Sequence, residues 1–358
     1  MQTAINSPRF LMLAPMEGVV DACLRELLSA IGGLDRCVTE FVRISGQQLP
    51  ERVFLRYCPE LRQHSHTASG IPVYLQLLGD RPDIMAINAL RAATLGAIGI
   101  DLNFGCPARS VNNHGGGSVL LKNPENLYNI ASAIRQSLPE HIPLTAKMRL
   151  GYNDKSLALD NALALQAAGV AEIAVHGRTK LEGYRPPAYW QEIGKLSDAL
   201  DIPVIANGEI WNLDDLQRCI QESRTDRIML GRGLIACPDL ALIARGRQQT
   251  ALHWGDICLL LLHYYRQLQL CCDAHHINNL IKQWLVYLRQ HYAEGFLFFE
   301  QVKRLKAASD MADALRHELR QQQQLRGISG RIGELDLRTL LAEENRLCSS
   351  APTVAASC

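Results

Sequence analysis

The chain has 358 residues, of which 47% are hydrophobic and 20% are charged. This apolar share is ordinary for a globular protein and excludes a collagen-like, a mostly disordered or a simple coiled-coil plan. Lys and Arg number 37 against 36 Asp and Glu, so the formal net charge is +1. That balance disfavours a purely electrostatic nucleic-acid binder but allows a local basic face.

The N-terminus has no basic segment followed by a long apolar stretch, and the densest apolar run, Ile257–Leu262, is too short to span a bilayer. We therefore expect a cytoplasmic protein without a membrane segment. The 11 cysteines are scattered, with no CxxC pair. This pattern predicts neither a disulfide framework nor a metal site, and most of the cysteines are expected to be small buried hydrophobes.

Short β-rich runs alternate with segments of helical spacing over the first two-thirds of the chain. The expected strands, in order, are Phe10–Ala14, Cys37–Phe41, Val73–Leu77, Ile98–Asn103, Leu144–Met148, Glu172–His176, Val204–Asn207 and Arg227–Leu230. Helical spacing recurs between them, for example at Asn126–Leu138, Leu157–Ala168 and Leu213–Ile220. This alternation predicts an α/β fold, a (β/α)8 TIM barrel. An open doubly wound sheet is disfavoured because its first turn would read GxGxxG, and here that turn reads APMEG.

The pattern becomes helical beyond the barrel. Expected helices are Ile257–Leu270, His276–His291, Phe296–Leu305 and Met311–Gln324, enough for a small C-terminal helical bundle domain. We therefore divide the chain into a barrel domain at 1–248, a helical domain at 249–326 and a tail at 327–358. The last ten or so residues of the tail are expected to be disordered.

Polar and glycine residues follow most of the expected strands, where the active site of such a barrel lies. Asn207-Gly208-Glu209 follows the seventh strand and Gly231-Arg232-Gly233 the eighth. Glycines there let backbone N–H groups approach an anion, so the pair favours a phosphorylated cofactor or substrate over simple tight turns.

Three further side chains at the strand ends carry potential chemistry. Lys147 lies inside an apolar strand, so it must pair across the barrel mouth, reach solvent or face a ligand such as an anionic flavin ring. His176 in the next strand indicates a functional site only in combination with the neighbouring residues. Cys106 lies between Gly105 and Pro107 at a strand end, and on the residues alone both a catalytic thiol and a structural one stay open.

The ordered segments APMEG, TEFVR, QLLG, LNFGCP, VNNHGGG, KMRLG, HGRT, NGEI and GRG closely resemble the tRNA-dihydrouridine synthases over roughly residues 10–310. TEFVR, EGYR and IKQWLVYLR are most similar to the bacterial C subfamily, which reduces uridine 16 of the D-loop. The resemblance implies FMN at the barrel mouth and NADPH as reductant, with hydride passing from FMN N5 to uracil C6. Cys106 would protonate C5, because a thiol is protonated at neutral pH, and Asn103 would bind the flipped base.

The resemblance also assigns binding residues. Those matching FMN contacts are Pro15, Met16, Glu17, Gln76, Lys147, His176, Asn207, Gly208, Glu209, Gly231 and Arg232. Those matching tRNA contacts are Arg43, Asn103, Arg178, Tyr184, Lys282, Trp284, Arg289, Lys303 and Arg304. From charge alone, the stretch from Lys282 to Arg289 would be a solvated helix face with Trp284 in the core.

Two positions depart from the family pattern: Ser118 stands where we expect alanine, and His114 is unusual in its loop. We expect neither to touch the chemistry directly. The alternative functions are a dihydroorotate- or dihydropyrimidine-type FMN oxidoreductase acting on a free base, and a non-enzymatic RNA-binding protein. The lack of an obvious apolar seam favours a monomer.

Overall fold

The computed structural model describes residues 8–350. Within it the chain divides into two compact units. The first consists of the residues up to Ser29 together with Gly33–Gln249, and the second of Ala30–Gly32 together with the chain from Thr250 onward.

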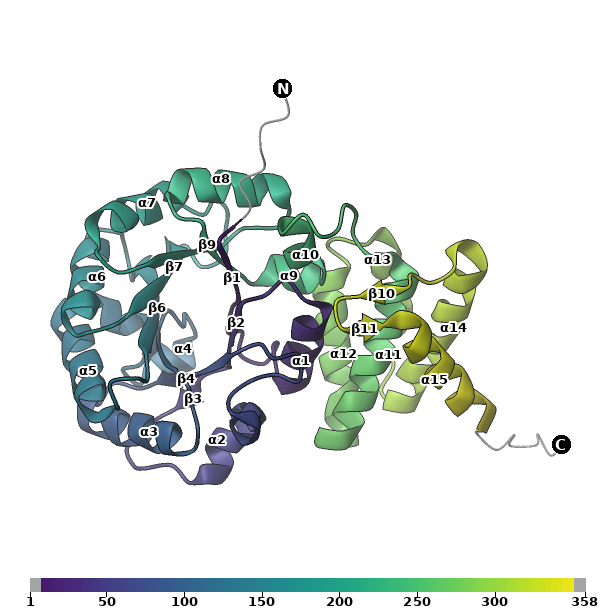
Figure 1. Ribbon diagram of the computed structural model, residues 1–358, viewed down its shortest axis with the longest axis horizontal. Helices are drawn as coiled ribbons and strands as arrows, with labels where there is room; N and C mark the ends of the chain where they lie inside the picture. Colours follow the sequence, from purple (N-terminus) through teal and green to yellow (C-terminus); the bar gives the residue numbers. More distant parts are fainter. Residues whose placement is uncertain (1–7, 351–358) are drawn as a thin grey trace. The chain divides into compact units, whose positions relative to one another are not determined.

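The first unit is a closed barrel of eight parallel strands (Figure 1). They are β1 (Phe10–Leu13), β2 (Arg36–Val38), β4 (Val73–Leu78), β5 (Ile100–Phe104), β6 (Leu144–Gly151), β7 (Glu172–Thr179), β8 (Val204–Asn207) and β9 (Arg227–Leu230). The ring closes because β1 pairs with both β2 and β9, and β2 pairs with β4. A two-residue strand, β3 (Val42–Arg43), lies beside the end of β4. The predicted TIM barrel is confirmed.

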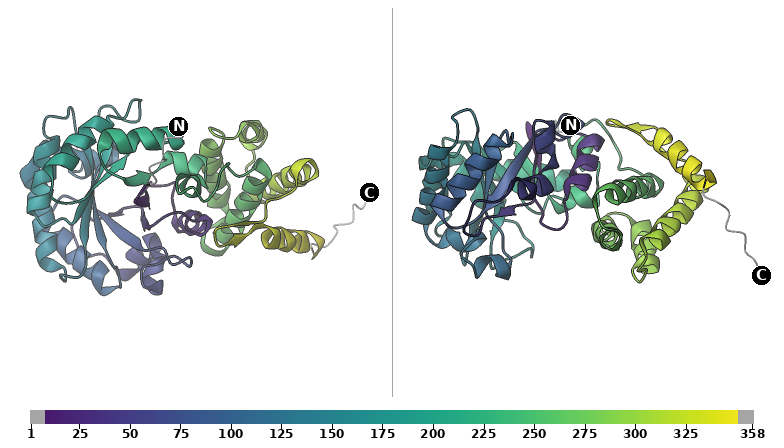
Figure 2. Two further views of the ribbon diagram at one scale, coloured as in Figure 1. Left: turned by 45° about the horizontal axis from the view of Figure 1, so that its top comes forward. Right: turned by 90° about the horizontal axis from the view of Figure 1, so that it is seen from below.

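Helices surround the strands on the outside of the barrel, as two further views show (Figure 2). They are α1 (Ala22–Ile31), α2 (Glu51–Tyr57), α3 (Pro82–Thr94), α5 (Pro124–Ser137), α6 (Ala158–Ala167), α7 (Trp190–Ala199), α8 (Leu213–Ser223), α9 (Arg232–Ala236) and α10 (Leu240–Ala244). The short helix α4 (Arg109–Asn112) is drawn within the ring in Figure 1, and the connections also contain the 3-10 turns η1 (Pro59–Gln63) and η2 (Gly117–Lys122). Asn123 and Asn212 begin α5 and α8, where each side chain accepts a backbone N–H of the first turn.

Bounds differ from the predicted ones in six of the eight strands, and the largest differences are in the second, fifth and sixth. The second strand ends at Val38 rather than Phe41. Beyond it, the Thr39 hydroxyl accepts the backbone N–H of Gln76 at 3.0 Å, in place of a backbone carbonyl of the neighbouring strand. The fifth and sixth expected strands run on to Gly151 and Thr179. Their polar ends resembled loops in sequence, yet Arg149 and Arg178 are buried inside the barrel wall.

Apolar side chains fill the barrel interior. Met12, Val38, Ala174, Ile205 and Met229 form one buried cluster drawn from strands around the ring. The barrel is therefore a packed core rather than a pore.

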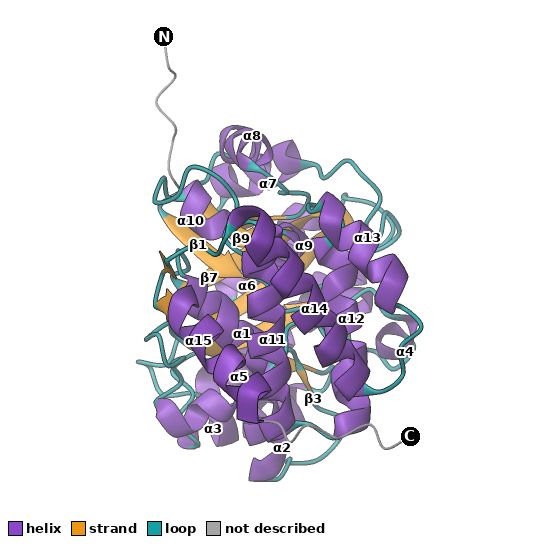
Figure 3. Ribbon diagram, turned by 90° about the vertical axis from the view of Figure 1, so that its right-hand side faces the viewer, coloured by secondary structure: helices purple, strands orange, loops and turns teal. Residues whose placement is uncertain are grey.

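The second unit is a helical bundle (Figure 3). It contains α11 (Trp254–Cys271), α12 (Ala274–Leu288), α13 (Ala293–Val302), α14 (Ala308–Arg326), a hairpin of β10 (Arg331–Ile332) and β11 (Leu335–Asp336), and α15 (Leu337–Ser350). Helix α11 packs along both α14 and α12. Each of the four helices expected here is present with shifted ends. Nowhere in residues 8–350 is a helix both long and apolar enough to cross a membrane.

Residues 327–350, assigned to a tail by the sequence analysis, instead fold with the bundle. Glu344 of α15 is 2% exposed and forms ion pairs with Arg266 of α11 and Arg316 of α14. Ser329 donates its backbone N–H and its hydroxyl to Asp256 of α11, at 2.8 and 2.6 Å. The expectation of a disordered end concerns residues 351–358, which lie outside the described residues.

Candidate active site

The strand register brings the expected polar side chains to one level at the carboxyl end of the barrel. Asn103 of β5 lies opposite Lys147 of β6. Arg149 of β6 lies opposite His176 of β7, which lies opposite Asn207 of β8. Four neighbouring strands thus present a continuous polar band, built from residues far apart in the chain.

Hydrogen bonds hold the backbone of Cys106 on both sides. The Asn103 Oδ1 accepts the N–H groups of Gly105 and Cys106 at 3.0 and 2.9 Å. The Cys106 carbonyl accepts the Ser118 hydroxyl at 2.6 Å and the Asn112 amide at 2.9 Å. Ser118 is fully buried. Ser118 therefore supports the backbone of Cys106 without touching its thiol, and the expectation that it does not contact the chemistry directly stays a prediction.

The Cys106 side chain lies in an apolar pocket. It is 9% exposed and packs with Phe41, Leu78 and Val111. Burial raises the pKa of the thiol and the carboxylate of Glu17 raises it further, outweighing the backbone N–H of Ala108 and the nearby Arg149. The thiol therefore keeps its proton at neutral pH, the state that a proton donor needs.

A chain of buried amides orients Asn103. Its Nδ2 donates to the Gln76 Oε1 at 2.7 Å, and the Gln76 Nε2 donates to Asp101 at 2.6 Å. Asp101 also accepts the Thr145 hydroxyl, and burial raises its pKa to about 6. Gln76 thus has a supporting role that sequence reasoning missed, and its contact with a cofactor ring stays a prediction.

Lys147 reaches across β7 to the end of β8. Its Nζ donates to the Asn207 Oδ1 at 3.0 Å, while the Asn207 Nδ2 donates to the Met229 carbonyl at 2.8 Å. Ala174 lies opposite Lys147 in the intervening strand and is small enough to leave the path open. Burial and the neighbouring Arg149 lower the pKa of Lys147 to about 8. An anion bound here would offset the free-energy cost of burying the Lys147 cation.

Glycines at the ends of β8 and β9 make close approaches that no side chain would tolerate. Gly208 has φ +113°, and a Cβ there would lie 3.1 Å from the His176 Nε2. A Cβ on Gly233 would lie 2.0 Å from the Ile210 carbonyl oxygen. Glycine is therefore required at Gly208 and Gly233 for close packing, and the partly exposed guanidinium of Arg232 lies at the same edge.

The Glu209 side chain has a structural role, and a contact of Glu209 with a cofactor stays a prediction. Its carboxylate forms ion pairs with Arg178 and Arg232 and accepts the Trp211 indole N–H at 2.9 Å. Although burial alone would raise it, the Arg178 and Trp211 hydrogen bonds lower the pKa of Glu209. An ionised carboxylate repels phosphate. We therefore assign Glu209 to holding the two arginines in place rather than to binding a phosphate through its side chain.

Two buried polar atoms at this edge lack hydrogen-bond partners within residues 8–350: the His176 Nδ1 and the Arg178 Nη1. Burial and the cations Arg149 and Lys147 lower the pKa of His176 well below its usual value, so the ring is neutral. Unsatisfied buried polar groups are costly. Together with the Lys147 cation and the glycine edge, they fit an anionic, hydrogen-bonding cofactor such as FMN.

The loop that follows β1 lies next to the end of β9. A Cβ on Gly231 would lie 3.6 Å from both the Met16 sulfur and the Ala14 methyl carbon. The carboxylate of Glu40 accepts the Gly18 N–H and holds the loop. Pro15 and Met16 are half-buried and Glu17 is exposed, so this loop is positioned to meet a ligand at the mouth, as predicted for these three residues.

Of the residues predicted to contact tRNA near the mouth, Arg43 and Tyr184 are accessible and Arg178 is not. Arg43 is exposed on β3, and Tyr184 is 53% exposed. The Tyr184 ring lies over the guanidinium carbons of Arg232 and Arg149, at 4.7 and 5.2 Å. Arg178 is 0% exposed and pairs with Glu209. This burial disfavours contact with an RNA phosphate, and the assignment of Arg178 to tRNA stays a prediction.

In the helical unit, Trp284 is misassigned. It is 1% exposed and packs edge-on against Tyr264 at 5.4 Å, so it belongs to the bundle core. The Lys282 Nζ donates to the Leu305 carbonyl and ties α12 to the end of α13. That bond gives Lys282 a structural role, whereas its contact with tRNA stays a prediction.

Three basic residues keep an accessible position in that unit. Arg289 is half-buried, with its guanidinium over the Phe299 ring at 4.5 Å. Lys303 is exposed and pairs with Glu300, and Arg304 is exposed beside it. Side chains of this kind suit phosphate contacts.

Sequence reasoning missed Arg149 as a site residue. Its Nε donates to the Gly105 carbonyl at 2.9 Å, and its Nη1 donates to the carbonyls of Thr179 and Gly183 at 3.0 and 2.9 Å. It therefore joins the cysteine loop to the end of β7. Its signal was present in the sequence, since a second cation two residues after Lys147 lies on the same face of the strand.

Sequence comparisons agree with this arrangement. A profile described as dihydrouridine synthase matches residues 12–324. A tRNA-dihydrouridine(16) synthase of Shewanella oneidensis is 48% identical over 314 residues, which cover 87% of this chain and 99% of that protein. One from Ralstonia nicotianae is 45% identical over 312 residues, covering 86% and 96% of the two chains.

Among solved structures, a 2-naphthoyl-CoA reductase in complex with 2-naphthoyl-CoA is similar with a TM-score of 0.53. It is 15% identical, and the match covers 76% of this chain and 55% of that one. At this identity the likeness supports the barrel fold alone.

Proposed function

The chain belongs to the dihydrouridine synthase family, and we propose that it reduces uridine 16 in the D-loop of tRNA. It is a flavin-dependent tRNA-dihydrouridine synthase that uses FMN. Position 16 is supported by the names of relatives that it matches over nearly their whole length. The observation that carries the reaction is the protonated Cys106 thiol, whose backbone is held after β5 by Asn103, Asn112 and Ser118.

The residues around the mouth divide the binding of FMN among them. Bound FMN supplies the hydride that adds to C6 of the uracil. Lys147 and His176 are placed to face the ring and its ribityl chain. Gly208, Gly231 and Arg232 receive the phosphate, and Glu209 holds Arg232. Pro15, Met16 and Glu17 support the ring from the loop after β1.

Cys106 completes the reduction. Hydride addition at C6 leaves an electron pair at C5, and the thiol donates its proton there, so a C–H bond forms and an S–H bond breaks. The thiolate that remains regains a proton from solvent. Asn103 donates one N–H to Gln76, and its second N–H is placed to bind the base. The uridine must be flipped out of the RNA to reach this pocket.

The tRNA is bound through the exposed basic and aromatic side chains. Arg43 and Tyr184 act at the mouth, and Arg289, Lys303 and Arg304 act on the helical unit. Cations contact phosphates, and the Tyr184 ring can stack on an unstacked base. NADPH serves as reductant. The protein acts as a monomer in the cytoplasm, and the reaction requires no metal.

The decisive experiment uses purified full-length protein, an unmodified tRNA transcript and NADPH. Nuclease fragments are mapped for dihydrouridine by mass spectrometry, with Cys106→Ala as the control. Dihydrouridine at position 16 that is lost in Cys106→Ala supports the site, the acid and the position together. Reduction at another D-loop uridine overturns the position alone.

Free uracil and dihydroorotate are assayed alongside the tRNA. Turnover of either without RNA would support a free-base oxidoreductase instead. Purified protein without flavin, inactive on every substrate, would contradict the assignment of the mouth to FMN.

A further inference from the structure

The connection between α11 and α12 carries a group of side chains that the reaction does not use. Six consecutive residues there read Cys271-Cys272-Asp273-Ala274-His275-His276, and five of them are of metal-ligating type. They lie in the helical unit, on elements that contribute nothing to the barrel mouth.

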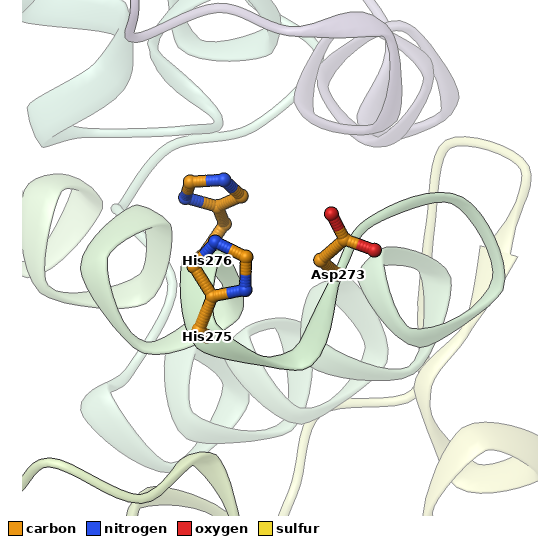
Figure 4. A group of neighbouring side chains, drawn as sticks. All are labelled: Asp273, His275 and His276. Atoms are coloured by element: carbon orange, nitrogen blue, oxygen red, sulfur yellow. The ribbon is translucent and has the colours of Figure 1, made fainter.

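The ligand atoms of three of these residues lie close together. One carboxylate oxygen of Asp273 and one ring nitrogen each of His275 and His276 all lie within 4.8 Å of one another. Figure 4 shows the two imidazoles next to each other, with the carboxylate beside them. Two ligands bound at 2.0–2.2 Å to one ion lie at most about 4.4 Å apart. A small rotamer change therefore brings all three onto a common ion.

Exposure makes that change inexpensive and the site reachable. All three side chains are exposed, so no packing opposes a rotation and an ion can enter directly from solvent. The ring centroids of His275 and His276 are already 3.8 Å apart. The two imidazoles therefore lie close together in the structure before any ion binds.

The backbone position of Asp273 adds an independent observation. Asp273 is the N-cap residue of α12, where an aspartate side chain ordinarily accepts an N–H of the first turn. In the described structure its carboxylate makes no such capping bond, and only its backbone carbonyl bonds, to the His276 N–H at 2.9 Å. Asn123 and Asn212, at the same position of α5 and α8, do cap their helices. The Asp273 carboxylate is thus not engaged in capping α12, and one of its oxygens lies within 4.8 Å of a ring nitrogen of each histidine.

The donor set selects the class of ion. Two imidazole nitrogens and one carboxylate oxygen suit borderline divalent transition ions such as Zn²⁺, Ni²⁺ and Cu²⁺, whereas Mg²⁺ and Ca²⁺ prefer oxygen ligands throughout. We propose that Asp273, His275 and His276 form a surface site for one divalent transition ion, with water in its remaining positions.

Binding there has a structural consequence. Asp273 belongs to the short connection after α11, and the two histidines belong to the first turn of α12. An ion held by all three ties the connection to the helix start. Because the ion binds the folded chain, it raises the apparent stability of the helical unit.

The test is calorimetric titration of the chelator-treated full chain with ZnCl2 and with NiCl2. The reference protein carries Cys271→Ser and Cys272→Ser, which removes the neighbouring thiols as competing ligands. We expect one ion per chain, an affinity unaffected by millimolar Mg²⁺, and a rise in melting temperature with added Zn²⁺. His275→Ala combined with His276→Ala, and separately Asp273→Asn, should each weaken binding at least tenfold.

His141→Ala, which removes an exposed histidine of the barrel unit, is the matched control and should bind like the reference. Equal melting temperatures of all variants without metal exclude misfolding as the cause. The proposal is overturned by the absence of saturable binding, by loss of binding in the double serine reference, or by unchanged binding in the histidine variants. None of these outcomes bears on tRNA reduction, which is assayed separately.

Discussion

The Nζ of Lys147 and the Oδ1 of Asn207 lie 3.0 Å apart, joining β6 to β8 across the strand between them. This hydrogen bond and the attraction of the Asp101 carboxylate favour the charged lysine, but burial and Arg149 outweigh them and lower its pKa. A neutral amide stabilises a cation less than an anion does. An anionic ligand bound near Lys147 would therefore stabilise its charge more than Asn207 does.

Binding of FMN to the cofactor-free protein should weaken as the pH rises through about 8, the pKa of Lys147. Below this pH the lysine is already cationic. Above it, binding must also take up a proton, so the affinity should fall by up to roughly tenfold per pH unit. Quenching of FMN fluorescence between pH 7 and 9 measures the dissociation constant.

Lys147→Met provides the comparison. It should bind FMN more weakly at neutral pH and show a flat profile, because its side chain carries no charge to lose. An equal pH slope in both proteins would assign the effect to another group and contradict the role of Lys147.

Asn112→Ala should lower kcat for tRNA reduction by about 10- to 100-fold, because small displacements of a reacting group are this costly. The Asn112 amide donates to the carbonyls of both Cys106 and Ala108, so its removal frees the loop that aims the thiol. Ser118→Ala should cost less, since the Ser118 backbone N–H still reaches the Cys106 carbonyl at 3.1 Å.

Single-turnover kinetics separate this from a general structural loss. Reduction of the flavin by NADPH should be unchanged in Asn112→Ala, while the oxidation of the reduced enzyme by tRNA slows. Asn113→Ala, at the exposed neighbouring position, is the matched control. Equal slowing of both half-reactions would count against a role in aiming Cys106.

The barrel was predictable because its strands are short apolar runs separated by helical spacing, a pattern set by local chemistry. The mouth was predictable where a residue type is unusual for its place, as with Lys147 inside a strand. The ion pair between Arg178 and Glu209 was not predictable. A charge near a strand end resembles a ligand contact, and partners far apart in sequence cannot be paired without the fold.

Trp284 is a second residue whose role could not be decided from the sequence alone. Its spacing on α12 was compatible with the bundle core, and the structure confirms that alternative. The metal-ligating group was passed over because its ligands are consecutive rather than spaced like a CxxC pair. Only the turn between α11 and α12 reveals that Asp273 faces both histidines.

Removing Arg304 should weaken tRNA binding more at low salt than at high salt. A contact between a cation and a phosphate releases counterions, so Arg304→Ala should reduce the slope of log affinity against log salt by about one. Filter binding across a salt series measures this slope. Arg320→Ala, an exposed arginine of α14 outside the predicted contact set, should leave it unchanged, and an equal effect would indicate nonspecific charge.

Trp284→Ala distinguishes a core role from an RNA contact. Truncating a buried tryptophan should cost about 3–5 kcal/mol of stability, so the helical unit should melt at a lower temperature without RNA present. A variant with unchanged melting but weaker tRNA binding would restore Trp284 to the contact set.

The buried pair Arg25–Glu60 should be the most sensitive ion pair of the barrel unit. The Arg25 Nε and Nη2 donate to the two Glu60 oxygens at 2.7 and 2.9 Å, and the arginine is 0% exposed. Glu60→Gln leaves a buried guanidinium without its counter-charge, so we expect a loss of about 3–5 kcal/mol in unfolding free energy. Urea unfolding followed by circular dichroism measures it.

A double replacement makes this prediction specific. Arg25→Met with Glu60→Leu removes both charges and keeps similar volume, so it should be nearly as stable as the parent, or more so, because neither charge need then be desolvated. Lys195→Ala, which breaks the exposed Lys195–Glu192 pair of α7, should change stability little. If the double variant lost as much stability as Glu60→Gln, shape rather than charge would be responsible at this position.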